Sequence, residues 1–386
     1  MILLVILLPT LAASASGASF STPANLGAGF NPNVQSVGTQ VYVAWTDKSS
    51  GIMFRASSDG GQTFSSAVKV GAGGQYPIMS ATGNNVYIVW SSGGINFVNS
   101  SDNGAHWSKP IKVGPVGAIT PFITSDSSVI SVVYDLSTSA SSYVTSSSDS
   151  GKTWTTPYQF SDGHEGQVAV SGSNVYVIAD SNSKANVQYG VSHDSGKTFA
   201  MRSLSAGSEP WIVATGSNVY AVWETKGPQS LVWFMSSPDN GNTVSYKIIS
   251  GNMPDSWNPM MQAIGSSVWV GIEELGAKTQ NWMLTSTDGG STWKSTSVSG
   301  LGHQNGFIFS VATTDGTNVF AMWLELSGSN WVVMVACSPD GGSTWSTVNI
   351  GQSDANTDLA IGSMSSNGPH GFAAWQHNSA ISFSFS

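Results

Sequence analysis

One eight-residue pattern returns seven times along this chain and limits its fold more than any other feature. The pattern is Ser-x-Asp-x-Gly-x-Thr followed by Trp or Phe, and its clearest copy is Ser286–Trp293. A short aspartate can accept hydrogen bonds from the backbone amides that follow it, and glycine can adopt positive φ. Each copy, called an Asp box below, therefore predicts a tight turn between two strands. The other six copies, two of which depart from the pattern at His106 and Val244, are Ser57–Phe64, Ser100–Trp107, Ser147–Trp154, Ser192–Phe199, Ser237–Val244 and Ser338–Trp345.

The aspartates of these boxes are interpreted as structural groups that close the turns, and not as catalytic acids. They are also not interpreted as calcium ligands, because calcium loops need several alternating carboxylates and each box holds one. The seven residues are Asp59, Asp102, Asp149, Asp194, Asp239, Asp288 and Asp340.

A second repeat alternates with the Asp boxes. Six times a Gly-x-Asn/Ser/Gln-Val-aromatic step, such as Gly216–Tyr220, precedes a strand-like run that often ends in tryptophan. Glycine, serine and asparagine followed by β-branched and aromatic residues indicate a hairpin turn and a strand. Successive box aspartates lie 43 to 52 residues apart. A period of this size with four strands, A to D, is typical of the blades of a β-propeller.

The two ends of the chain predict eight blades, with seven as the alternative. After the last box, Asp358–Ser363, Gly371–Trp375 and Ile381–Ser386 resemble strands A, B and C, and the chain then stops. At the other end, Gly17–Ala24 resembles Gly61–Val68, the segment that leads into a strand D. We therefore expect the N-terminal segment to complete the last blade, which would close the ring and leave no exposed sheet edge. A seven-bladed ring would leave one terminus unpaired.

The boxes resemble those of the BNR or Asp-box repeat proteins of the sialidase superfamily, over residues 17–386. The resemblance implies a sialidase-like β-propeller and a link to glycoside hydrolysis, although enzymes, receptors and assembly factors share the motif. The sialidases of this family have six blades, and they hold the substrate carboxylate with three arginines. This chain has two arginines, Arg55 before the first box and Arg202 after the fourth, in expected strands C and D. We therefore expect no hydrolysis of sialosides.

Charged residues make up only 9% of the chain, and the net charge is −9. Because the chain has no cluster of basic residues, we do not expect it to bind nucleic acid through phosphate contacts. The one cysteine, Cys337, is expected to be a buried, inert thiol. No cofactor is expected.

Residues 1–15 are interpreted as a secretory signal peptide, and residues 16–386 as one propeller domain. Ile2–Leu8 is an unbroken apolar run, and Ala13–Ala15 supplies the small residues of a cleavage site. No later apolar segment approaches about 20 residues, so the mature protein is expected not to insert into a membrane. The expectation is a secreted or cell-surface monomer.

The alternating direction of the four strands in each blade predicts on which face a binding site lies. The A–B and C–D turns, and with them the boxes, share one face, while the B–C and D–A loops share the other. On this loop face an outer ring of acids ends the B strands: Asp47, Asp135, Asp180, Glu224, Glu273, Glu274 and Glu325. An inner ring precedes or opens the A strands: Asn31, Gln75, Glu165, Glu209, Asn258, Asn305 and Asp358. Aromatic residues accompany them at Tyr76, Phe122, Trp211 and Trp257.

Acids beside aromatic rings suit sugars, because rings stack on apolar sugar faces while carboxylates accept hydroxyl protons. The alternative is that acidic loop ends only keep the surface soluble. The binding candidates are Trp211, Tyr76, Trp257, Glu224, His164 and His303. The two histidines occupy matching D–A loops, but no close-spaced pair of ligands supports a metal site, and none is predicted.

Two functions follow as hypotheses. The first is a non-catalytic propeller that binds a glycan or an extracellular surface protein. The alternative is a glycoside hydrolase in which Glu165 and Glu209, from adjacent blades, are the two catalytic carboxylates. Retaining and inverting hydrolases need carboxyl separations of about 5–5.5 Å and about 6.5–9.5 Å. A third possibility, a purely structural envelope component, also stays open.

Overall fold

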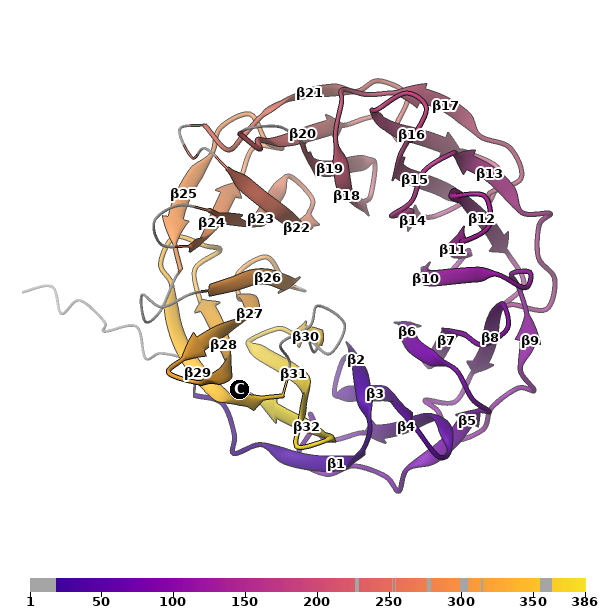
Figure 1. The fold of residues 1–386 in the computed structure, drawn as a ribbon, viewed down its shortest axis with the longest axis vertical. Coiled ribbons are helices and arrows are strands. Elements are labelled where there is room, and N and C mark those ends of the chain that lie inside the picture. Colours follow the sequence, from indigo (N-terminus) through magenta and orange to yellow (C-terminus); the bar gives the residue numbers. More distant parts are fainter. Residues whose placement is uncertain are drawn as a thin grey trace, which may run out of the picture.

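The computed structural model describes residues 19–225, 229–251, 253, 255–275, 279–298, 305–313, 315–354 and 363–386. Within these ranges the chain forms 32 strands in eight four-stranded antiparallel sheets. The sheets stand around a central axis as the blades of a β-propeller (Figure 1). No described helix is long and apolar enough to cross a membrane. The expected signal peptide lies outside the described residues.

Each of blades 1 to 7 takes its four strands in chain order, with strand A at the axis and strand D at the rim (Figure 1). Blade 1 contains β2 (Phe30–Val37), β3 (Gln40–Asp47), β4 (Gly51–Ser57) and β5 (Val68–Gly71). Blade 2 contains β6 (Gln75–Thr82), β7 (Asn85–Ser91), β8 (Ile95–Ser100) and β9 (Ile111–Lys112). Blade 3 contains β10 (Ala118–Ser125), β11 (Ile130–Leu136), β12 (Ser141–Ser147) and β13 (Tyr158–Ser161). Blade 4 contains β14 (Gln167–Ser171), β15 (Asn174–Asp180), β16 (Val187–Ser192) and β17 (Ala200–Ser203).

Blades 5 to 7 repeat this order with strands of similar length. Blade 5 contains β18 (Ser208–Thr215), β19 (Asn218–Glu224), β20 (Val232–Ser237) and β21 (Ser245–Ile248). Blade 6 contains β22 (Ser256–Ile264), β23 (Ser267–Glu274), β24 (Gln280–Ser286) and β25 (Lys294–Ser297). Blade 7 contains β26 (Asn305–Ala312), β27 (Val319–Ser327), β28 (Asn330–Ser338) and β29 (Ser346–Ser353).

Blade 8 is built from both ends of the chain. Its strands A to C are β30 (Ser363–Asn367), β31 (His370–His377) and β32 (Ala380–Phe385), and its strand D is β1 (Ala24–Ala28). β1 pairs with β32, and the Ser21 amide donates to the Phe385 carbonyl at 2.7 Å. The expected eight-bladed closure is confirmed. Strand A of this blade begins at Ser363, where the predicted strand Asp358–Ser363 was expected to end, and residues 355–362 lie outside the described part.

The hydrophobic core lies between blades, not within them. One cluster, for example, joins Tyr176 and Tyr189 of blade 4 to Val219 and Trp223 of blade 5. A twisted four-stranded sheet has two apolar faces, so each blade needs a neighbour on both sides. Tryptophans that end the B strands fill these interfaces and are almost fully buried: Trp45, Trp90, Trp223, Trp323 and Trp375. Cys337 is buried as expected, and burial raises the pKa of its thiol to about 12.

The seven boxes form the predicted turns. In the box of Asp288, the carboxylate accepts bonds from the Thr292 amide at 2.9 Å, the Thr292 hydroxyl at 2.7 Å and the Ser286 hydroxyl at 2.8 Å. The Ser286 hydroxyl oxygen also accepts the Gly290 amide at 2.8 Å. His106 replaces threonine without loss, because its Nδ1 lies 2.6 Å from the Asp102 carboxylate. The described residues contain no group of three or more His, Cys, Asp or Glu side chains placed to hold a metal ion.

These turns predict a loss of stability in acid. Hydrogen bonds from the Thr292 amide, the Thr292 hydroxyl and Ser286 lower the pKa of Asp288 to about 2, and the pKa of Asp149 is lowered to about 2 in the same way, chiefly by the Thr153 hydroxyl. A folded pKa below the unfolded value of 3.8 stabilises the protein above that value, and this contribution is lost as the pH falls toward 2. We expect the thermal midpoint to drop between pH 4 and pH 2. A double variant, Asp149→Asn with Asp288→Asn, should be less stable at pH 7 and lose less over that interval. An equal loss would rule out these two boxes as a source of the acid sensitivity.

Candidate functional site

A cavity of about 700 Å³ opens where the ends of the chain meet, among blades 8, 1 and 2. We call it the seam cavity. It lies on the loop face, since its residues come from B–C loops and from the links between strand D and the next strand A. The lining residues are Ala28, Gly29, Phe30, Asn31, Asp47, Lys48, Ser49, Tyr76, Gln376 and Ser379. Of the binding candidates that the structure describes, Tyr76 alone lines this cavity.

The aromatic side chains of the seam cavity come from the start of two neighbouring A strands. Both strands contain a bulge here, between Phe30 and Asn33 in β2 and between Gln75 and Ile78 in β6. Asn31 and Tyr76 occupy the bulges at φ of 52° and 57°. Left-handed backbone is uncommon for residues other than glycine. Tyr76 therefore contributes its ring from a backbone position that the repeat itself imposes.

The same left-handed position recurs in later blades at Thr120, Glu165, Glu209 and Asn258. Four of the seven inner-ring residues expected from the sequence belong to this left-handed set: Asn31, Glu165, Glu209 and Asn258. The left-handed conformation itself does not follow from the sequence, because asparagine is the only one of these residue types that often adopts positive φ.

Polar groups of the seam cavity are held by the B–C loop of blade 1. Asp47 Oδ1 accepts three bonds, from the Ser49 amide and hydroxyl and from the Ser50 amide. These bonds, with that of the Ser49 hydroxyl first, hold the pKa of the Asp47 carboxyl below its usual value. Lys48 follows in this turn, and its ammonium lies 5.7 Å from the centroid of the Phe30 ring. The cavity therefore offers two aromatic rings, two side-chain amides, two serine hydroxyls, the Tyr76 phenol, one carboxylate and one ammonium.

The catalytic candidates lie in another sector of the loop face, in blades 4 and 5. The Glu209 amide donates to Glu165 Oε2 at 2.8 Å, so the two residues are neighbours across the blade interface. Trp211 contacts Phe122 of blade 3 edge-on, with ring centroids 5.5 Å apart. His164 is tied through its backbone to Asp180 at both its amide and its carbonyl. None of these residues lines the seam cavity.

Most of the outer acidic ring is buried. Asp135, Glu224, Glu273 and Glu325 are 0–8% exposed, so the interpretation of these four as solubilising surface groups is wrong. Glu224 Oε2 accepts the amide of Asn258 in the next blade at 2.8 Å. With its side chain 1% exposed, Glu224 has no surface to offer a ligand and instead links two blades.

The remaining candidates are placed as follows. Trp257 is half-buried, and its strand position pairs with Glu273. His303 lies outside the described residues. Arg202 lies in the outermost strand of blade 4 and donates from Nη2 to the Asn242 carbonyl at 3.2 Å, while Arg55 lies in β4. Neither arginine lines the seam cavity, as their expected strand positions imply.

No family model matches the chain, and no curated protein matches its sequence. Among solved structures, a family PL25 polysaccharide lyase, an ulvan lyase bound to -[GlcA(1-4)Rha3S]-, aligns over 94% of this chain and 95% of its own, at TM-score 0.52 and 11% identity. YCF48 bound to D1 peptide aligns over 80% of this chain and 94% of its own, at TM-score 0.50 and 15% identity. The Hadza microbial sialidase Hz136 aligns over 94% of this chain and 67% of its own, at TM-score 0.43 and 10% identity.

The chain is a β-propeller similar in fold to the ulvan lyase and to YCF48. At such low identities the likeness concerns the fold alone, and it assigns neither an activity nor a ligand.

Proposed function

We propose that this protein is an exported, non-catalytic propeller that binds a saccharide in the seam cavity. The observation behind the proposal is the cavity itself: about 700 Å³, with Phe30 and Tyr76 beside the side-chain amides of Asn31 and Gln376. Ligand sites typically measure about 300–1,000 Å³ and combine apolar rings with a few polar groups. Rings that stack on a sugar face, with amides and hydroxyls around them, suit a saccharide better than a flat protein surface.

Proteins of similar fold support no single ligand class. The PL25 lyase is bound to a saccharide and YCF48 to a peptide. The choice of a saccharide therefore rests on the chemistry of the cavity. The carboxylate among its lining residues, Asp47, is held by three hydrogen bonds to its own turn, which favours binding over acid catalysis. The N-terminal apolar run supports export.

Replacing Tyr76 by alanine tests the proposal. We expect a glycan array of plant, algal and microbial oligosaccharides to yield a ligand. We expect Tyr76→Ala to weaken its binding about five- to thirtyfold, because the loss of one stacking ring costs about 1–2 kcal/mol. Trp211→Ala is the matched control, since Trp211 opens a different A strand and does not line the cavity. A ligand whose affinity fell with Trp211→Ala and not with Tyr76→Ala would move the site to blades 3–5.

The alternative function remains a glycoside hydrolase built on Glu165 and Glu209. The 2.8 Å contact between the Glu209 amide and Glu165 Oε2 favours it, because it makes the two residues neighbours. Screening the purified protein on a glycoside panel, with Glu165→Gln and Glu209→Gln variants as controls, separates the two functions. Turnover that both variants abolish would replace the binding proposal.

A further inference from the structure

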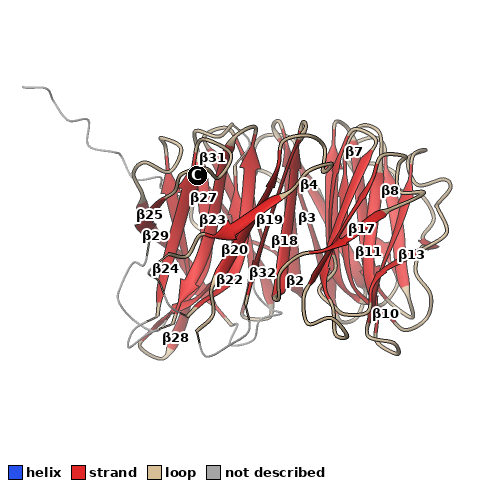
Figure 2. Ribbon diagram, turned by 90° about the horizontal axis from the view of Figure 1, so that it is seen from above, coloured by secondary structure: helices blue, strands red, loops and turns tan. Residues whose placement is uncertain are grey.

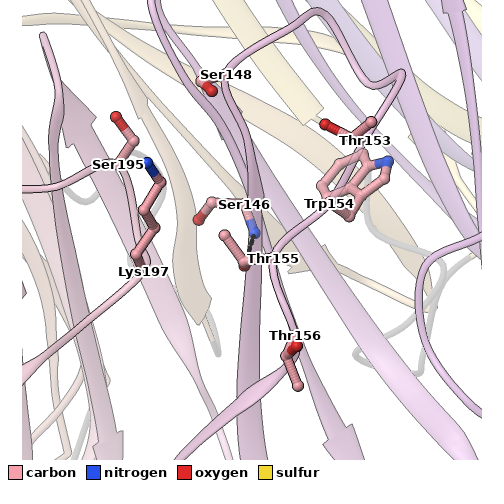
Figure 3. Close-up of a pocket in the computed structure, with 8 residues that line it drawn as sticks. All are labelled: Ser146, Ser148, Thr153, Trp154, Thr155, Thr156, Ser195 and Lys197. Carbon is pink, nitrogen blue, oxygen red and sulfur yellow. Dashed lines mark hydrogen bonds between the residues drawn. The ribbon is translucent and has the colours of Figure 1, made fainter.

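A second, smaller cavity lies on the box-bearing side of the molecule, away from the loop face. It measures about 440 Å³ and runs between the end of β12 with the Asp box of blade 3 on one side and the Asp box of blade 4 on the other. Figure 3 shows Ser195 and Lys197 of the blade 4 box on one side, across from Ser146, Thr155 and Trp154 of blade 3. We call it the inter-box groove. Its full lining is Ser146, Ser148, Thr153, Trp154, Thr155, Thr156, Ser195 and Lys197.

A contact made at the next three blade boundaries is missing at this one. There, a cation on the outer strand reaches over to the box of the following blade and donates to the carbonyl just before the box threonine. The three bonds are Arg202 Nη2 to Asn242 at 3.2 Å, Lys247 Nζ to Ser291 at 2.8 Å and Lys294 Nζ to Ser343 at 2.8 Å. In blade 3 the matching outer-strand positions hold Thr155 and Pro157, neither of which can make this contact.

The comparison between blades 5 and 6 shows the consequence. The corresponding cavity there is lined by Lys247 and Ser291, the two partners of one such contact, and it measures about 180 Å³. At the boundary of blades 3 and 4 the cation belongs to the box of blade 4 and not to blade 3. It is Lys197, at the box position just before the threonine, whose carbonyl accepts the bond at the other three boundaries. The groove is thus larger, and its ammonium is not engaged with a neighbouring box.

The chemistry of the inter-box groove is simple. Lys197 is its one charged lining residue, it is exposed, and no described carboxylate lies within 4.0 Å of its ammonium. Six of the other seven lining residues carry hydroxyls. Thr155 Oγ1 accepts the Ser146 amide at 3.0 Å and Thr153 Oγ1 donates to Asp149, whereas Ser148 and Thr156 are exposed. The Trp154 indole is fixed by its bond to the Gly151 carbonyl at 3.1 Å.

We propose that the inter-box groove binds a saccharide unit that carries an oxyanion, a sulfate ester or a carboxylate. The ammonium supplies a charge-assisted bond to the oxyanion, the exposed hydroxyls bond sugar hydroxyls, and the indole offers an apolar edge. This site is separate from the seam cavity and does not depend on the function proposed for it. A chain of net charge −9 would otherwise repel such a ligand, so the local cation is essential.

The test uses glucose 6-sulfate as the probe and the indole NMR signal of Trp154 as the reporter. We expect a saturable shift with the wild type, and five- to tenfold weaker binding in Lys197→Met, as befits one exposed charged hydrogen bond. Lys152→Met is the matched control: it removes a lysine from the same position of the blade 3 box, outside the groove, and should leave binding unchanged. Glucuronate should bind in place of the sugar sulfate, and Tyr76→Ala should have no effect.

Three outcomes would overturn the proposal. Equal losses in Lys197→Met and Lys152→Met would show general charge attraction. Equal binding of inorganic sulfate would remove the saccharide from the proposal, and equal binding of unmodified glucose would remove the oxyanion. Because both lysine variants keep their box bonds, their melting curves should match that of the wild type, and folding does not confuse the result.

Discussion

Deleting residues 16–26 should remove more than about 5 kcal/mol of stability and leave a protein that aggregates on heating. The deletion takes away most of β1, the outer strand of blade 8, and with it the pairing to Phe383 and Ser382. Leu26, 2% exposed in the cluster that joins blades 8 and 1, is lost as well, and a buried leucine alone is worth about 2–5 kcal/mol. Several backbone hydrogen bonds go with it, and β32 becomes an exposed edge. Thermal unfolding and light scattering measure both effects.

A circular permutant is the matched control for this deletion. In blade 8, the Ser386 amide donates to the Gly371 carbonyl at the start of β31. In blade 7, the box serine Ser338 pairs with Val319 at the start of β27. Ser386 therefore occupies the position of a box serine. Phe20 packs against the neighbouring core as the box aromatic of blade 8 would. Joining Ser386 to Gly17 through Thr-Asp-Gly completes an eighth box, and new ends can be opened in the A–B turn of blade 4. We expect this permutant to melt within a few degrees of the wild type. An unchanged melting curve for the deletion would contradict the structural role of β1.

The architecture could be predicted from sequence because each blade repeats the same local chemistry. The box of Asp288 contains all its own bonding partners within eight residues, so the turn can be inferred without knowing its surroundings. The same holds for the tryptophans that end the B strands. Closure was predictable too, since Gly17–Ala24 repeats a segment whose place in a blade was already known. Figure 2 shows the result, a ring of upright strands with turns at both faces.

The site was less predictable, because its parts come together only when the ring closes. The seam cavity combines Gln376 and Ser379 from the end of the chain with Phe30 and Lys48 from its beginning. Tyr76 was selected as an aromatic residue of the loop face, but nothing local distinguished it from Trp211 or Trp257. The structural role of the acids does not follow from the sequence for a related reason. A glutamate at the end of a strand could face solvent, and only the neighbouring blade shows that Glu224 bonds the Asn258 amide instead.

Acidic side chains make hydrogen bonds between successive blades in one half of the ring, from blade 3 to blade 6. Asp135 of blade 3 accepts the amide of Glu165 in blade 4, Glu165 accepts that of Glu209 in blade 5, and Glu224 of blade 5 accepts that of Asn258 in blade 6. Each accepted amide belongs to a left-handed residue at the start of a strand A. Glu209 and Asn258 lie in bulges of β18 and β22, and Glu165 lies two residues ahead of β14. In each case a carboxylate of the preceding blade accepts the amide, as buried backbone donors require. Asp135, Glu165 and Glu224 thus link each strand A to the preceding blade.

Replacing Asp135 by alanine should therefore cost about 2–4 kcal/mol, the second largest effect we expect. The Asp135 side chain is 4% exposed. Its Oδ1 accepts the Ser142 hydroxyl at 2.6 Å, and its Oδ2 accepts the Thr120 hydroxyl at 2.8 Å and the Glu165 amide at 3.2 Å. Alanine would remove the acceptor of all three bonds. The buried Ser142 hydroxyl keeps the Gly163 carbonyl at 3.0 Å and the exposed Thr120 hydroxyl can turn to solvent, whereas the Glu165 amide loses its bond to the neighbouring blade. Hydrogen bonds to a charged group contribute about 1.5–3 kcal/mol each, partly offset here because a buried charge is also removed. Asp135→Asn keeps one acceptor oxygen, so its stability should lie between those of the wild type and Asp135→Ala. Asp47→Ala, which loses only bonds within one exposed turn, should be less destabilising than either Asp135 variant. Urea unfolding of the three variants gives the order, and an Asp135→Ala variant as stable as Asp47→Ala would mean that the carboxylate is not what joins blades 3 and 4.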